Sequence, residues 1–336
     1  MKFIFSFILI FVLLNHVGLI AQPTTTIAFG SCMHQDKPAP LLKVASDIKP
    51  DYFIFLGDNI YGDTENMDTL QMKYNLLAAK PEFQKLTKQT QILATWDDHD
   101  YGKNDGGKEY PQKEASKQLF LKFWGEPDTS SRFSHQGIYH AKYIIVKDKI
   151  IQILLLDTRT FRDSLIVIKK ENEDYYLPNS NPKVSLLGSQ QWQWVENELG
   201  KKADIRIIAS STQFGISHNG YEAWANFPKE QHKMLELIKK TKAKGVFFIS
   251  GDVHYAELSK INYKGLYPIY DLTSSGITQT WDFATPNSNR IGTPVMENNI
   301  GLIRIKWNKD PEIQFQIIDG ENKVRIQKLI SLSDLK

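Results

Sequence analysis

Residues 52–59 read Tyr-Phe-Ile-Phe-Leu-Gly-Asp-Asn, a run of apolar side chains followed at once by a glycine and two polar side chains. An apolar run of this length, bounded by a turn signal, indicates a strand that is buried on both faces, as strands of parallel sheets are. The pattern recurs, and the polar turns that end the apolar runs are Gly30–Cys32, Gly57–Asn59, Trp96–Asp100, Asp157–Arg159, Ser210–Gln213 and Ser250–His254. Because parallel strands bring their carboxyl ends to one edge of a sheet, we expect these turns to lie together.

The segments between and after these runs predict the fold class. Apolar residues at helical spacing predict the main helices at residues 38–48, 113–124, 190–199 and 229–240. Residues 139–156 predict a hairpin, and alternating segments near the end of the chain predict strands at 256–263, 267–272, 300–307, 312–318 and 323–329. The sequence therefore predicts an α/β protein, a two-sheet mixed β-sandwich flanked by helices. We interpret residues 286–294 as a flexible loop.

Composition limits the class of protein and of ligand. The chain has 336 residues, of which 41% are hydrophobic, and 41 Lys and Arg balance 38 Asp and Glu to a formal net charge of +3. These values exclude a disordered chain and a protein that binds nucleic acid by bulk charge. We therefore expect no stable nucleic-acid partner and a charged ligand that a local site recognises. Residues 22–336 are expected to form a single domain, whose oligomeric state is left open.

The first 21 residues have the features of a secretory signal peptide. Lys2 precedes an apolar run at residues 3–14, and Ala21 stands before Gln22 and Pro23. The apolar run is shorter than the ~20 residues that a transmembrane helix needs. We expect cleavage after residue 21 and an exported protein, periplasmic or extracellular, with no transmembrane segment afterwards. The alternative is a retained N-terminal anchor.

The expected cluster of turns carries the ligands of a metal centre. Cys32 is the single cysteine of the sequence and cannot form an internal disulfide, so in an exported protein it should be either buried or bound to a metal. Several carboxylates packed at one sheet edge repel one another, and a multivalent cation relieves that repulsion. Thiolate and imidazole suit transition metals, whereas carboxylate and amide oxygens suit hard cations. The mixture predicts a centre of two or three ions.

Each motif also has a purely structural interpretation. Asp58 could end a turn, residues 97–100 could form a solvated acidic turn, and His254 could be a hydrogen-bonded histidine of the core. Arg159, a candidate for binding a phosphoryl oxygen, could instead pair with Asp157 or Asp163. The metal interpretation is favoured because all the motifs follow strands at the same edge, whereas structural residues would scatter over both edges.

Five segments in order resemble the PhoD-like (alkaline phosphatase D) family of the calcineurin-like metallophosphoesterase superfamily. They are Phe29–Cys32, Leu56–Tyr61, Thr95–Asp100, Leu156–Arg159 and Ser250–His254, and the resemblance runs from about residue 27 to residue 275. It implies a two-sheet sandwich flanked by helices. It also implies hydrolysis of phosphate esters at a site similar to the iron and calcium centre of the family, with Fe³⁺ and Ca²⁺ as cofactors.

The resemblance assigns the softer metal position first. It places Cys32 on iron as a thiolate and makes Asp58 the bridging carboxylate, and Asp252 and His254 match the metal ligands of the last motif. Members of the family also use a tyrosinate on iron. Tyr74 is the closer match to that tyrosine, and Tyr61 is the second.

The remaining roles follow from the same resemblance. Asp98 and Asn104 match metal ligands, and His99 matches the histidine that contacts the phosphate and protonates the leaving oxygen. Asp100 stands where the best-known members have Glu, and the loop after Tyr61 is short, so the substrate preference of the family is not carried over.

The leading hypothesis is an exported metal-dependent phosphoesterase that hydrolyses small-molecule phosphate mono- or diesters with a metal-activated water. A nuclease or a phospholipid phosphodiesterase on the same centre is the second hypothesis. A non-catalytic, calcium-binding secreted protein is the third. Cys32 opposes the third, because calcium takes oxygen ligands and has no use for a thiolate.

Overall fold

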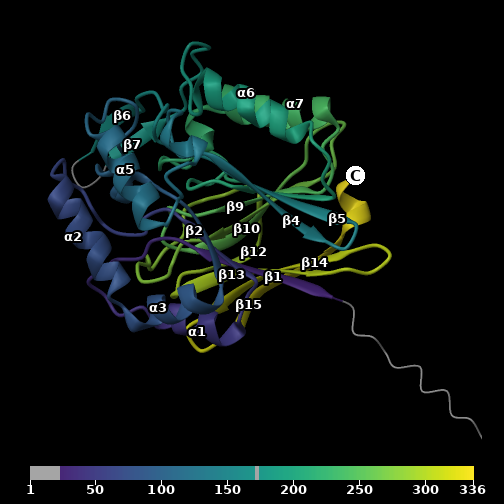
Figure 1. The fold of residues 1–336 in the computed structure, drawn as a ribbon. Helices are drawn as coiled ribbons and strands as arrows, with labels where there is room; N and C mark the ends of the chain where they lie inside the picture. The colour runs from purple at the N-terminus through teal and green to yellow at the C-terminus, as the bar shows by residue number, and fades with distance from the viewer. Residues whose placement is uncertain (1–22, 171–173) are drawn as a thin grey trace, which may run out of the picture.

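The computed structural model describes residues 23–170 and 174–336, and in this part of the chain two large sheets pack face to face with helices outside them (Figure 1). The predicted two-sheet α/β architecture is confirmed. The first sheet has the order β15-β14-β13-β1-β2-β3, and the second has the order β12-β10-β11-β9-β8-β5-β4. The expected signal peptide, residues 1–21, lies outside the described residues. Among the described helices, none combines the length and the apolar character required to span a bilayer.

The bounds of the elements are as follows. The first sheet contains β1 (Thr24–Gly30), β2 (Tyr52–Leu56), β3 (Gln91–Thr95), β13 (Asn299–Lys306), β14 (Glu312–Asp319) and β15 (Val324–Ser331). The second sheet contains β4 (His140–Val146), β5 (Lys149–Leu155), β8 (Ile205–Ala209), β9 (Val246–Ser250), β10 (Ala256–Ile261), β11 (Ile269–Ser274) and β12 (Arg290–Val295). The helices are α1 (Pro40–Ile48), α2 (Met67–Ala78), α3 (Pro81–Gln89), α4 (Asp98–Tyr101), α5 (Lys113–Phe123), α6 (Gly188–Leu199) and α7 (Pro228–Thr241), and a small hairpin joins β6 (Ile166–Lys169) to β7 (Asp174–Leu177).

The apolar run at residues 52–56 forms β2, which is buried on both faces as that run predicts. Ile54 and Leu56 belong to the core between the two sheets, whereas Phe53 and Phe55 belong to the core beneath α1, α2, α3 and α5. Alternate residues of a strand point to opposite faces, so one apolar run serves both cores. A third core lies between the second sheet and helices α6 and α7.

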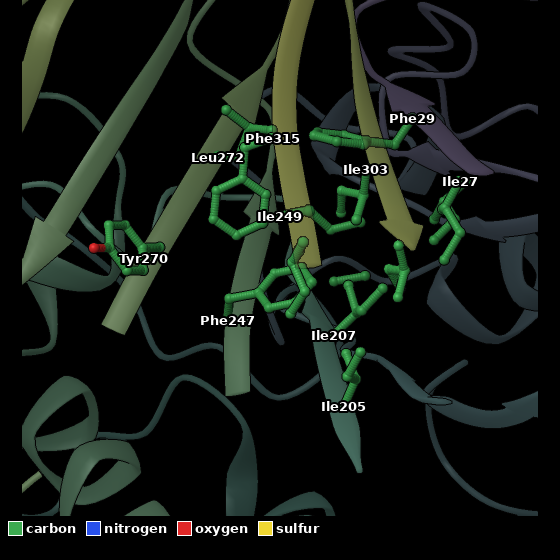
Figure 2. Packing of buried hydrophobic residues seen from close by; sticks show 14 of the residues in the cluster. Ile27, Phe29, Ile205, Ile207, Phe247, Ile249, Tyr270, Leu272, Ile303 and Phe315 are labelled. Carbon is green, nitrogen blue, oxygen red and sulfur yellow. The ribbon is translucent and has the colours of Figure 1, made fainter. Parts of the chain in front are cut away.

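The core between the sheets is filled by large apolar side chains from both of them (Figure 2). Ile27 and Phe29 come from β1 and Phe315 from β14, and they meet Ile207 and Phe247 of the second sheet. Each fully buried side chain of this kind stabilises the fold by about 1.5–3 kcal/mol relative to an exposed one. This core fixes the distance between the sheets and therefore between the turns that each sheet contributes.

Parallel pairing brings the six polar turns to one edge. Strands β1, β2 and β3 are parallel neighbours, and so are β5, β8 and β9. Hydrogen bonds join the two groups at their carboxyl ends: Thr95 Oγ1 donates to the carbonyl oxygen of Leu156 at 2.7 Å, and Trp96 Nε1 donates to Asp157 Oδ1 at 3.0 Å. The edge is thus continuous across both sheets.

One interpretation of the sequence is wrong. Residues 286–294 were expected to form a flexible loop, but Arg290–Val295 is strand β12, which pairs with β10 through Leu258 and Ile291. The segment is rich in Asn, Gly and Pro, residues depleted in strands, and its place at the edge of the sheet tolerates them. The predicted hairpin over residues 139–156 is confirmed as β4 and β5.

Candidate metal centre

Four candidate ligands share an uncommon backbone conformation. The φ angle is 60° at Cys32, 50° at Asp58, 76° at Asp252 and 54° at His254. These values lie in the left-handed region, which residues other than glycine rarely adopt. Such conformations cost on the order of 1–3 kcal/mol each and are found mainly where a functional site imposes them. The strain points to the strand ends as the site.

Cys32 lies at the centre of the first group of ligands. Its Sγ atom is fully buried, 3.4 Å from Asp58 Oδ2 and 3.0 Å from Ser275 Oγ. Ligand atoms of Cys32, Asp58 and His254 all lie within 4.8 Å of one another. Burial raises the pKa of Cys32 to about 12 in the metal-free protein, because the thiolate loses its hydration. A bound cation reverses this preference by stabilising the thiolate.

The structure reverses the order in which the sequence ranked the two tyrosines. The hydroxyl of Tyr61 lies 3.0 Å from His254 Nε2, at the edge of the first group. Tyr74 lies on the buried face of α2 with Leu70, and its ring packs 4.4 Å from that of Phe123 in the core beneath the helices. Tyr74 therefore belongs to the core, and Tyr61 is the tyrosine that the fold brings to the centre.

A second group of ligands adjoins the first and shares residues with it. Oxygen atoms of Asp97, Asp98 and Asp252 lie within 4.8 Å of one another, and so do ligand atoms of Asp58, Asp98 and His99. Asp58 Oδ1 is buried and has no hydrogen-bond partner. Burial raises the pKa of Asp58 and Asp252, and neighbouring negative groups raise both further. An orphaned buried oxygen among crowded carboxylates fits a site for cations.

Two acidic residues of a further potential ligand group were not predicted from the sequence. Asp98, Asp105 and Glu222 form a further group whose oxygen atoms lie within 4.8 Å of one another. Asp105 follows Asn104, which lines the same cavity and whose side-chain amide donates to Asp105 Oδ2 at 2.9 Å. Asp105 could have been predicted as a site residue, because it follows the predicted ligand Asn104 in the sequence. Glu222 follows no strand, and nothing in the local sequence sets it apart.

His99 lies on α4 and faces acidic neighbours. Its Nδ1 atom is 2.8 Å from Asp63 Oδ2, and the ring lies 4.1 Å from that of Tyr61. Burial lowers the pKa of His99, but the carboxylates of Asp98 and Asp58 outweigh that effect and raise the pKa to about 10. In the metal-free protein the imidazole is therefore protonated at neutral pH, in a residue that lines the cavity.

Arg159 does not lie where a substrate clamp was expected. Its side chain is fully buried, with Nε and Nη2 both 2.5 Å from Asp97 Oδ1 and Nη1 2.7 Å from Glu222 Oε2. Arg159 is not among the described residues that line the cavity. Arg159 therefore forms structural ion pairs. Its partners are Asp97 and Glu222, and not Asp157 or Asp163 as the sequence suggested. Arg159 holds two carboxylates in place beneath the site.

Comparisons with known proteins place the chain in a family. A family model described as PhoD-like phosphatase matches residues 147–328. Alkaline phosphatase D of Bacillus subtilis (strain 168) is 25% identical over 199 residues, which is 51% of this chain and 32% of that protein. The match thus spans about a third of the length of the curated relative.

Solved structures share the fold. The structure of PhoD superposes with a TM-score of 0.72 and 18% identity over 93% of this chain and 69% of that one. The purple acid phosphatase PPD1 of yellow lupin (Lupinus luteus) has a TM-score of 0.65 and 10% identity, over 92% and 54%. GAP50 of Plasmodium, described as an anchor in the inner membrane complex, has a TM-score of 0.60 and 11% identity, over 93% and 89%.

These three likenesses establish the fold and no activity, since one of the neighbours is described as an anchor. Family membership rests on the sequence. The family model covers more than half of the chain and includes the turns that carry Arg159, Asp252 and His254. The chain belongs to the PhoD-like phosphatase family.

Proposed function

We propose that the chain is a metal-dependent phosphoesterase that hydrolyses small-molecule phosphate mono- or diesters and is exported by its first 21 residues. The observation that carries the proposal is the set of adjoining ligand groups, which are linked to one another through Asp58 and Asp98, and whose members Asp58, Asp98, His99, Asp252 and His254 line one cavity. When bound, the ions supply an activated water near neutral pH and offset the charge of the phosphoryl oxygens. Membership of the PhoD-like family supports the reaction class.

The donor atoms support two kinds of ion. Cys32, His254 and Tyr61 offer sulfur, imidazole nitrogen and phenolic oxygen on one side, which suits a transition metal such as Fe³⁺. Asp98 and Asp252, with Asn104 lining the same cavity, offer oxygen atoms, which suit a hard cation such as Ca²⁺. Asp58 stands between the two positions and is the bridging candidate.

His99 is the candidate general acid. It lines the cavity and is held at Nδ1 by Asp63, which fixes the direction of the ring and raises the pKa of the imidazole. A protonated imidazole placed in this way can give a proton to the departing oxygen of the ester. Asp63 is then a positioning residue, because it acts through His99.

The charge of the cavity favours a small ester over a nucleic acid. Six carboxylates line it, and among the described lining residues there is neither a lysine nor an arginine. A polynucleotide requires cationic side chains along its phosphates, so a nuclease is disfavoured. A non-catalytic calcium protein is disfavoured by Cys32, which is buried against the carboxylate of Asp58.

The test compares metal content with activity in matched variants. Asp58→Ala and Asp252→Ala should each lose bound metal and hydrolysis of paired mono- and diester substrates while keeping the wild-type circular dichroism spectrum. Asp148→Ala, which removes a carboxylate that is 81% exposed on the β4–β5 turn, is the control and should retain both properties. Near wild-type activity in either site variant removes that residue from the centre, and activity in a fully demetallated protein refutes the proposal.

A further inference from the structure

One wall of the cavity is aromatic. Trp281 lines it beside His254, and the ring centroids of the two residues are 5.1 Å apart in an edge-to-face arrangement. The ring of Tyr221 lies 5.2 Å from that of Trp281. The ring of Phe283 stacks on that of Trp281 at 5.1 Å with an interplanar angle of 5°. His254, Trp281 and Phe283 thus form an aromatic ladder that begins at the candidate metal centre.

The outer end of the ladder is open to solvent. Phe283 is 45% exposed. An exposed aromatic ring continuous with a cavity is typical of a binding surface, and single exposed apolar residues elsewhere need no such explanation. The ladder therefore extends the cavity outward by an apolar surface.

The loop that carries the ladder is held by a buried polar network. The backbone N–H of Trp281 donates to the carbonyl oxygen of His254 at 2.9 Å. Further along, Thr285 Oγ1 lies 2.7 Å from the hydroxyl of Tyr255, and Asn287 Nδ2 donates at 2.7 Å to Glu257, which is fully buried. These contacts hold the loop on both sides of Phe283, so the rings of Trp281 and Phe283 have a fixed orientation before a ligand binds.

We propose that Trp281 and Phe283 form a stacking subsite for a planar aromatic ring on the leaving group of the phosphate ester. This inference rests on the proposed function and narrows its substrate class to esters of ring-bearing alcohols. The same cavity is also lined by carboxylates such as Asp105 and Asp174, which repel a second anionic group on the substrate. An uncharged flat ring meets no such repulsion and can pack against the aromatic rings of the ladder.

The test is a binding measurement that requires no hydrolysis. Calorimetry on the metal-containing protein compares benzylphosphonate with cyclohexylmethylphosphonate, which have the same charge and skeleton and differ in the planarity of the ring. We expect benzylphosphonate to bind about 3- to 10-fold more tightly. Phe283→Leu and Trp281→Leu should each bring the two dissociation constants close together. Leu329→Ala, at a residue that is 54% exposed on β15, should preserve the ratio.

Several outcomes overturn the subsite. They are equal affinities in the wild-type protein, binding of neither phosphonate, and a preference that survives Phe283→Leu. Binding of phosphatidylcholine vesicles that Phe283→Leu abolishes would assign the rings to a membrane and also overturn it. If the protein binds the two ligands with the expected ratio but hydrolyses no ester, the proposed function fails while the subsite stands.

Discussion

Cys32 is buried in a position that disfavours its charged form unless a cation is present. Its sulfur lies near a carboxylate and two hydroxyl groups, and burial raises the pKa of the thiol to about 12. A thiol kept only for packing does not need a left-handed backbone or an imidazole within 4.8 Å of its sulfur. The residue-scale geometry therefore favours metal binding over packing alone.

We expect the concentrated protein to be coloured if Cys32 binds ferric iron as a thiolate. Cys32→Ser should bleach or shift the visible band and weaken iron binding, because a neutral hydroxyl is a poor substitute for a soft anionic ligand. Visible spectra of both proteins at matched iron loading make the measurement, and Ser46→Ala, at a buried serine of α1, is a control. An unchanged spectrum in Cys32→Ser would assign the cysteine to packing.

His99 makes a different prediction, because its role does not require it to bind metal. His99→Asn should lower kcat by ~10²–10⁴ with metal content retained. The loss should be smaller for esters of acidic alcohols such as nitrophenol, since their oxygen leaves without a proton. Rates for a series of leaving groups make the measurement. An equal loss across the series would contradict the general-acid role.

At the scale of elements, the site depends on how closely two strand ends approach. Gly57 follows β2 with a φ of +102°, and an added Cβ would lie 2.5 Å from Asp97 Cβ and 2.6 Å from Asp97 N, just after β3. Only glycine allows this conformation and this contact together. The turn that carries Asp58 and the turn that carries Asp98 are thereby held side by side.

Gly57→Ala should destabilise the protein on the order of 2–4 kcal/mol, because it combines an unfavourable φ with a steric clash against backbone atoms. Urea unfolding of wild type and variant at equal metal loading measures the difference. Gly320→Ala is the matched control, since the added Cβ there would meet no atom within 4 Å. A Gly57→Ala protein as stable as Gly320→Ala would show that the two turns can separate freely.

At the scale of the whole molecule, the sequence predicted the features that depend on the burial of neighbouring residues in the chain. The apolar run of β2 and the polar turn after it are visible in eight residues, so both the strand and Asp58 were predicted. Glu222 reaches the site only because the chain returns to it from a distant segment, and local sequence carries no trace of that contact. Tyr74 was misassigned although its helical spacing with Leu70 already indicated the core face of α2. Contacts between distant segments are the part that the sequence did not reveal.

The stability of the whole chain should depend on pH through a buried histidine away from the predicted ligands. His140, at the start of β4, is partly buried near Arg132, and burial together with that cation lowers the pKa of His140 to about 4. In the unfolded chain the pKa is about 6.5. Between these two values the unfolded chain binds more protons, so the free energy of unfolding falls as the pH drops from 6.5 towards 4. The contribution of this group is fully present above pH 6.5.

We therefore expect His140→Gln to flatten the acid side of the stability profile. The wild-type slope from this one group is at most about 1.4 kcal/mol per pH unit. Urea unfolding at pH 7, 6, 5 and 4.5, with wild type and variant in the same metal state, isolates the group as the difference between the two profiles. His232→Gln, which replaces an exposed histidine of α7, is the matched control. Parallel profiles for wild type and His140→Gln would contradict this prediction. They would show that protonation of His140 does not lower the free energy of unfolding, because Glu126, the acidic neighbour paired with Arg132, compensates for the charge.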